Sequence, residues 1–199
     1  MKTYKETIKE FKKNITKQEK KHNKKSNMKW IIEITMMAFI ISFIFSLASE
    51  AIMPNVPALL GTLLVIIFIG LGILFDMIGV AVTSADEKPF HSMSAKKIRG
   101  ANVAVIFKKN ADKVASFCND VIGDICGIIS GSAGVYIAAS MASTYNLNSF
   151  ICSLIITALI AALTIGGKAM GKSVAINKSE TILYEFSKTI SYIYKPRNK

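Results

Sequence analysis

Three polar residues, Asn119, Asp120 and Asp124, lie inside a long apolar stretch that runs from Val114 to Gly134. Residues three and four apart are neighbours on a helix. On this basis one helix face is expected to carry Ser116, Asp120, Gly123, Asp124 and Gly127. A carboxylate at the centre of a bilayer costs about 2.5–3.5 kcal/mol even on the lenient insertion scale. Two carboxylates on one face therefore suggest a cation site. The alternative is that both are neutral or hydrogen-bonded packing contacts.

Two further oxygen-bearing residues belong to another apolar run, Asp76 within it and Ser84 just after it. Mg²⁺ takes oxygen ligands in near-octahedral geometry, so carboxylates and hydroxyls gathered in a shielded place suit it. If the two runs are antiparallel helices, all these side chains lie toward the cytoplasmic half of the membrane. The predicted metal ligands are Asp76, Ser84, Asp120 and Asp124.

Glycine recurs every four residues in the same stretch, at Gly123, Gly127 and Gly131. This small-xxx-small spacing lets the backbones of two membrane helices approach closely. We expect a homodimer that packs partly through this glycine ridge.

The elements that must position these residues are long apolar helices. Of the 199 residues, 51% are hydrophobic, and they are concentrated in runs long enough to cross a bilayer. The expected spans run from about Lys29 to Ser49, from Ala58 to Thr83, from Val114 to about Ser143 and from Phe150 to about Ile165. The sequence therefore predicts an all-α membrane protein with four transmembrane helices and amphipathic juxtamembrane helices.

Positive charge orients these spans. The net charge is +12, and the first 29 residues hold eleven Lys against three Glu. The segment between Ser84 and Lys113 holds seven Lys or Arg against three acids. Since cytoplasmic loops carry the excess of Lys and Arg, we expect a multi-pass protein of the cell membrane with both termini in the cytoplasm.

Amphipathic spacing in the Ser84–Lys113 segment and in the tail predicts helices that lie along the membrane surface. Together with the basic arm, they are expected to contact anionic lipid headgroups. Nucleic-acid binding is the other common use of such charge, but no base-reading aromatic residues or motif accompany it, so no nucleic acid is expected as a partner.

The sequence offers little for catalysis or for a cofactor. It has no phosphate-binding loop and no HExxH zinc motif. The three cysteines fall inside predicted spans and His91 has no second histidine at metal spacing. Ser92 and Ser94 are expected to cap helices, because no positioned base follows them. We expect a protein that is not an enzyme and carries no cofactor.

From Ala58 to Ile193 the sequence resembles the transmembrane domain of the CNNM/CorB/CorC magnesium and cobalt transporters. The family's S-x-x-E-x-x-x-x-S-x-S stretch is matched at Ser84, Glu87, Ser92 and Ser94. An N-P-D-like helix start is matched at 110–112, and a G-N pair resembles Gly123 and Asp124. The family's G-E-x-x-P-K-S motif resembles Gly167, Lys168, Gly171, Lys172 and Ser173.

The resemblance implies a dimeric domain whose three helices hold a dehydrated Mg²⁺ near mid-membrane, open to the cytoplasm. It divides the chain into a basic cytoplasmic arm (1–28), an additional transmembrane helix (29–50) and a CNNM-like domain with its juxtamembrane belt (58–193). This chain departs from the family at Asp124 (Asn in the family), Lys168 (a glutamate of the ion site) and Gly171 (Pro). The CBS-pair and CorC-type cytoplasmic modules of the family are not expected in this chain.

Two hypotheses follow. The first is a divalent-cation (Mg²⁺ or Co²⁺) transporter, or a transporter-like protein, with an ion site between helices. The second is a non-transporting membrane scaffold or regulatory subunit that kept the fold and lost the ion. The intramembrane aspartates favour the first hypothesis, and Lys168 favours the second.

Overall fold

The computed structural model describes residues 28–193, and every regular element within this range is helical. Four helices here are long and apolar enough to cross a membrane, as the sequence predicts. They are α2 (Met28–Ile52), α3 (Ala58–Ser84), a continuous helical run at Ala111–Tyr145, and α8 (Ser149–Asn177). The predicted basic arm lies outside the described residues, apart from Met28.

The chain divides into two compact units, Met1–Met37 and Ala38–Lys199. The described part of the first unit is the beginning of α2. The second unit contains the rest of α2, the short 3₁₀ turn η1 (Met53–Asn55) and all later helices. Every residue of the candidate site belongs to this second unit.

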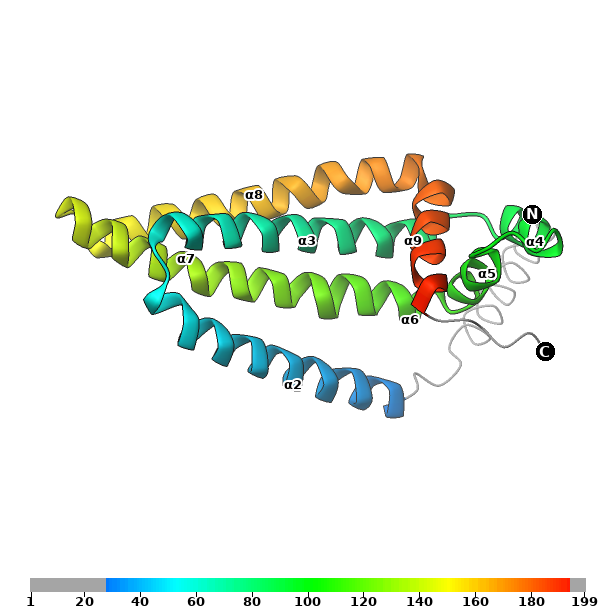
Figure 1. Cartoon of the computed structure of the whole chain (residues 1–199), viewed down its shortest axis with the longest axis horizontal. Helices are drawn as coiled ribbons and strands as arrows, with labels where there is room; N and C mark the ends of the chain where they lie inside the picture. Colours follow the sequence, from blue (N-terminus) through cyan, green and yellow to red (C-terminus); the bar gives the residue numbers. More distant parts are fainter. Residues whose placement is uncertain (1–27, 194–199) are drawn as a thin grey trace, which may run out of the picture. The chain divides into compact units, whose positions relative to one another are not determined.

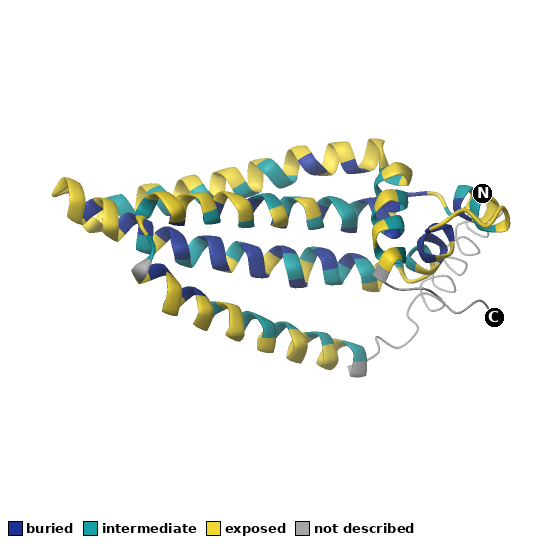
Figure 2. Ribbon diagram, in the orientation of Figure 1, coloured by how far each residue is buried: buried dark blue, intermediate teal, exposed yellow. Residues whose placement is uncertain are grey.

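Three helices of the second unit, α3, α8 and α7 (Asp124–Tyr145), pack along one another (Figure 1). Buried Val65 and Ile69 of α3 pack against Ala133 and Ile137 of α7. The third helix, α8, packs on both: a Cβ on Gly134 of α7 would collide with its side chain Ile160. Figure 2 shows buried residues throughout α7, whereas α8 is mostly exposed or intermediate.

The third span is not a uniform α-helix. It comprises α6 (Ala111–Ser116), the π-helical segment η2 (Phe117–Gly123) and then α7. A π-helix bonds residue i to residue i+5, so it turns less per residue than an α-helix, and such segments occur often at functional sites. The π-helix therefore changes which side chains of this span face α3.

Three amphipathic helices, α4 (Lys88–Ala95), α5 (Ala101–Lys109) and α9 (Ser179–Ile193), lie at the end of the bundle where α3 and α8 end (Figure 1). We call them the belt. Phe90, Val105 and Leu183 from the three helices are buried in one cluster with Val82 of α3. The predicted amphipathic juxtamembrane helices are thus confirmed.

The belt is fixed to the bundle and to itself by close contacts. The Lys108 ammonium of α5 donates hydrogen bonds to the last carbonyls of α3, to Val82 O at 3.2 Å and Thr83 O at 2.7 Å. Gly100 has a φ of +86°, and a Cβ there would stand 2.8 Å from the Lys188 Cα on α9. Only glycine fits this approach without strain.

Two boundaries differ from the sequence prediction. The third helical run begins at Ala111 instead of Val114, and α8 continues to Asn177, well past Ile165. Lys168 therefore lies within α8, beyond the predicted end of the fourth span. Gly167 does not end the helix because its bare backbone packs against Ile73 of α3, and glycine inside a helix costs only about 1 kcal/mol.

Candidate functional site

The four predicted metal ligands are not gathered into one cluster of side chains. Asp76 is buried on α3, with 5% of its surface exposed. Ser84 is exposed and ends that helix eight residues later, about 12 Å further along its axis. Asp120 and Asp124 are both exposed. Within residues 28–193, no group of three or more His, Cys, Asp or Glu side chains could hold a metal ion.

The predicted common face of the third span is also divided. Gly123 is buried, whereas Asp120 and Asp124, three residues before it and one after, are exposed. The prediction assumed 3.6 residues per turn through this stretch, but residues 117–123 form the π-helix η2. The different turn angle separates Gly123 from the two carboxylates.

A narrow contact between α3 and the third span surrounds Asp76. Gly72 and Gly79, one turn before and after it, are buried with it on the same face of α3. A Cβ on Gly72 would stand 3.2 Å from Cys126 Cβ. At Gly79 a Cβ would collide with the carboxamide of Asn119, so this carboxamide lies directly against the Gly79 backbone.

Two buried oxygen atoms in this contact have no hydrogen-bond partner among the described residues: Asp76 Oδ2 on α3 and Asn119 Oδ1 on η2. An unpaired buried polar group costs about 1–3 kcal/mol, and more when it is charged. Both atoms are acceptors, so a cation or a protonated group would compensate them. The sequence analysis noted Asn119 but did not place it in the site. Gly79, which faces Asn119, is the sequence feature that could have indicated the position of Asn119 in the site.

A lysine reaches the same region from α8. Lys168 Nζ lies 4.0 Å from Asp124 Oδ1, and their side chains are 23% and 69% exposed, respectively. A Cβ on Gly123 would stand 3.5 Å from this nitrogen and 3.9 Å from the Gly72 carbonyl oxygen. The ammonium therefore lies near the α3 face that carries Asp76. We call Asp76, Asn119, Asp124 and Lys168 the polar site.

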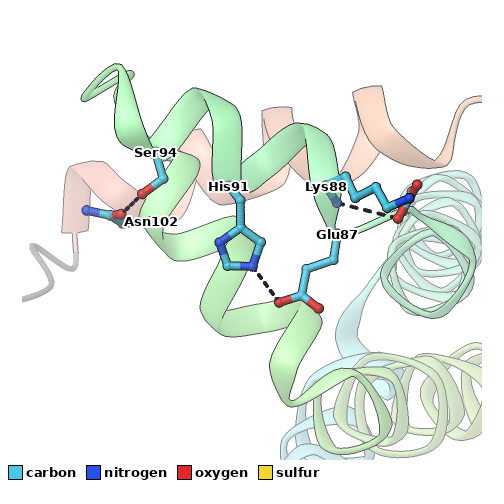
Figure 3. A network of polar contacts seen from close by, with 6 residues as sticks. Glu87, Lys88, His91, Ser94 and Asn102 are labelled. Atoms are coloured by element: carbon cyan, nitrogen blue, oxygen red, sulfur yellow. Dashed lines mark hydrogen bonds and ion pairs between the residues drawn. The ribbon is translucent and has the colours of Figure 1, made fainter.

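A second polar network lies on the belt, away from the spans (Figure 3). His91 Nε2 and Glu87 Oε1 are 2.8 Å apart one turn from each other on α4. The Ser94 hydroxyl donates to the Asn102 side chain, which joins α4 to α5. His91 is thus engaged by a carboxylate and is 53% exposed. These contacts stabilise α4 and connect it to α5 at the protein surface.

A cavity of about 300 Å³ lies at the other end of the bundle, beside η1. Its lining includes Met53, Gly61, Tyr136 and Ser140. It has no acidic or basic side chain in its lining, so it offers no charge to a cation.

The fold and the polar site define the class of the protein: an all-α chain with four helices long and apolar enough to cross a membrane. Three of these helical runs carry an ionisable side chain of the polar site: Asp76, Asp124 and Lys168. Comparison with protein-family models, curated proteins and solved structures finds no match.

Proposed function

We propose that this protein is an integral membrane transporter of divalent cations, Mg²⁺ or Co²⁺, or a transporter-like protein with an ion site between α3 and the third span. The observation that carries the proposal is the pair of unpartnered buried oxygens, Asp76 Oδ2 and Asn119 Oδ1. Ionisable residues inside membrane spans are costly and commonly mark ion pathways. The resemblance to the CNNM/CorB/CorC transporters supports the same function.

Asp76 and Asn119 would be the inner ligands, because their oxygens are the hard donors that Mg²⁺ prefers. The backbone carbonyls of Gly72 and Gly123 could complete the shell, since each carbonyl oxygen lies within 4 Å of the Cβ position of the other glycine. Asp120 and Ser84 are exposed toward the belt end of the helices and are placed to meet a hydrated ion before it enters. In this arrangement three of the four predicted residues, Asp76, Ser84 and Asp120, act in sequence instead of as one shell.

The distribution of positive charge indicates the location and orientation of the protein in the membrane. We place it in the cell membrane with both termini and the belt in the cytoplasm, since these segments carry the excess of Lys and Arg. The belt would then rest on anionic lipid headgroups, where each basic residue contributes about 1 kcal/mol. We further propose that the protein is a homodimer.

Ion uptake into proteoliposomes tests the proposed function. The purified protein should carry Mg²⁺ or Co²⁺. Asp76→Asn should lower uptake at least about tenfold, because it replaces the buried carboxylate with a neutral amide. Asp86→Asn is the matched control, since this carboxylate is exposed just beyond α3. Uptake that is unaffected by Asp76→Asn would contradict the proposed ion site.

The second candidate is a non-transporting scaffold or regulatory subunit. The ion pair of Lys168 with Asp124 favours it, because an ammonium in the site supplies positive charge without an ion. The same liposomes distinguish the two functions. A scaffold would give no uptake of Mg²⁺, Co²⁺ or Na⁺ above empty liposomes, even though the protein remains folded and correctly inserted.

A further inference from the structure

The position of Lys168 is fixed by the packing of its helix on α3. Its neighbour Gly167 packs against Ile73 of α3. Gly171, one turn later, packs against Met77: a Cβ added to Gly171 would stand 2.8 Å from Met77 Cγ. These small residues hold α8 close to α3. Lys168 lies between the two contacts, so its side chain is directed along the helix interface toward η2 and α7.

The end of the side chain occupies a space that Gly123 leaves open. Lys168 Nζ lies 3.5 Å from the position of a Gly123 Cβ, and the same position is 3.5 Å from the Cys118 carbonyl oxygen. Lys168 Nζ and the Cys118 carbonyl oxygen therefore both border this space, and the ammonium lies 4.0 Å from Asp124 Oδ1. Its side chain is only 23% exposed, whereas that of Asp124 is 69% exposed.

The same space borders the face of α3 that carries Asp76. The Gly72 carbonyl oxygen lies 3.9 Å from the same Gly123 Cβ position, and Asp76 follows Gly72 by one turn on the buried face of α3. An ammonium here attracts the Asp124 carboxylate, 4.0 Å away. It also repels a second positive charge, most strongly for a divalent ion in a medium of low dielectric constant.

We propose that Lys168 is a tethered counter-cation of the polar site, which sets its affinity for divalent cations by competing with them. This inference rests on the proposed cation site and concerns how Lys168 regulates binding there. In the resting state the ammonium compensates the charge of Asp124. A divalent ion binds when the lysine side chain moves out, toward the belt end of α8, where the lysine four residues on, Lys172, is exposed.

Binding of Mg²⁺ to purified variants tests this role. Lys168→Met keeps the length and apolar stem of the side chain and removes the charge. We expect it to lower the Kd for Mg²⁺ about tenfold or more, measured by titration calorimetry and by the rise in melting temperature that Mg²⁺ causes. Lys172→Met is the matched control, since it lies one turn further on α8 and makes no ion pair with a described residue. It should leave both quantities unchanged.

A second measurement needs no bound ion. Without divalent cations, the melting temperatures of Lys168→Met, Asp124→Asn and the double variant should be non-additive, because the two charges compensate each other. Additive shifts, or equal Mg²⁺ affinity in Lys168→Met and the unmodified protein, would overturn the role of Lys168 and leave the cation site standing. If non-additivity is found but no variant binds Mg²⁺, the tethered pair is real, whereas the proposed ion site and the competition with it are refuted.

Discussion

At the residue scale, the polar site depends on the contact between Gly79 and Asn119. The Asn119 carboxamide lies where a Gly79 side chain would be, so glycine is what admits it to the α3 face beside Asp76. Asn119 Oδ1 is then buried without a hydrogen-bond partner among the described residues. A side chain on residue 79 would displace the carboxamide from the face of α3. The polar site would then lose one of its two unpartnered buried oxygens.

Gly79→Ala should therefore displace Asn119 and destabilise the fold by about 1–3 kcal/mol, the usual cost of inserting an extra methyl group into a closely packed contact. Gly70→Ala is the matched control, because it lies on the same helix and no described atom comes within 4 Å of its Cβ position. It should be neutral or stabilise the helix by up to about 1 kcal/mol. Thermal melting in detergent, with and without Mg²⁺, measures both effects. Equal melting and an equal Mg²⁺ response in the two variants would show that Asn119 has no role in the site.

The sequence predicted part of this site and missed part for a definite reason. Asp76 was identified because a carboxylate in an apolar run is rare and costly. Asn119 was not selected because the expected face of the third span followed α-helical periodicity. A π-helix cannot be recognised from hydrophobic spacing alone, and it moved Asn119 and Gly123 toward α3 while leaving Asp120 and Asp124 exposed.

At the element scale, the belt and the bundle are joined by the end of α3. Helix carbonyls in the last turn have no partner within the helix and carry partial negative charge. Lys108 of α5 supplies this partner by donating to Val82 O and Thr83 O. The C-terminus of the helix that carries Asp76 is thus held by a side chain from the belt.

Lys108→Met should weaken this connection, costing about 1 kcal/mol because the ammonium bonds are partly exposed to solvent. The neighbouring Lys109→Met is the control: it removes the same charge from the same exposed helix end. Hydrogen exchange should show faster exchange in the last turn of α3 for Lys108→Met alone. Identical exchange in the two variants would mean that the contact does not hold the helix end.

The helices themselves were largely predictable from the sequence. Long apolar runs predicted all four spans, and amphipathic spacing predicted the belt. The end of α8 was missed because lysine alternates with apolar residues from Lys168 onward, a pattern typical of a segment along the membrane surface. Packing of Gly167 on Ile73 overrides that signal, and such a contact depends on a helix nearly a hundred residues away in the sequence.

At the scale of the whole molecule, the outward face of the third span carries groups that lipid would not cover well. Asp120 and Asp124 are exposed on it, and within the described structure nothing lies within 4 Å of the Cβ positions of Gly127 and Gly131. The glycines that pack helices within the chain are others, such as Gly134 and Gly167. Gly127 and Gly131 are therefore free to pack against a second copy, as expected for the small-xxx-small spacing.

Gly127→Leu should shift the detergent-solubilised protein from dimer toward monomer, because a large side chain would hold two copies of this face apart. The effect can be assigned to the interface, since the space around Gly127 within the described chain is open and the substitution need not disturb the fold. Gly70→Leu is the control, a second open glycine on a different helix, and should leave the dimer intact. Light scattering coupled to size exclusion gives the mass of each species, and circular dichroism confirms that the helices remain. A Gly127→Leu protein that stays dimeric would exclude this face as the contact between copies, and the exposed carboxylates would then need water or lipid headgroups to solvate them.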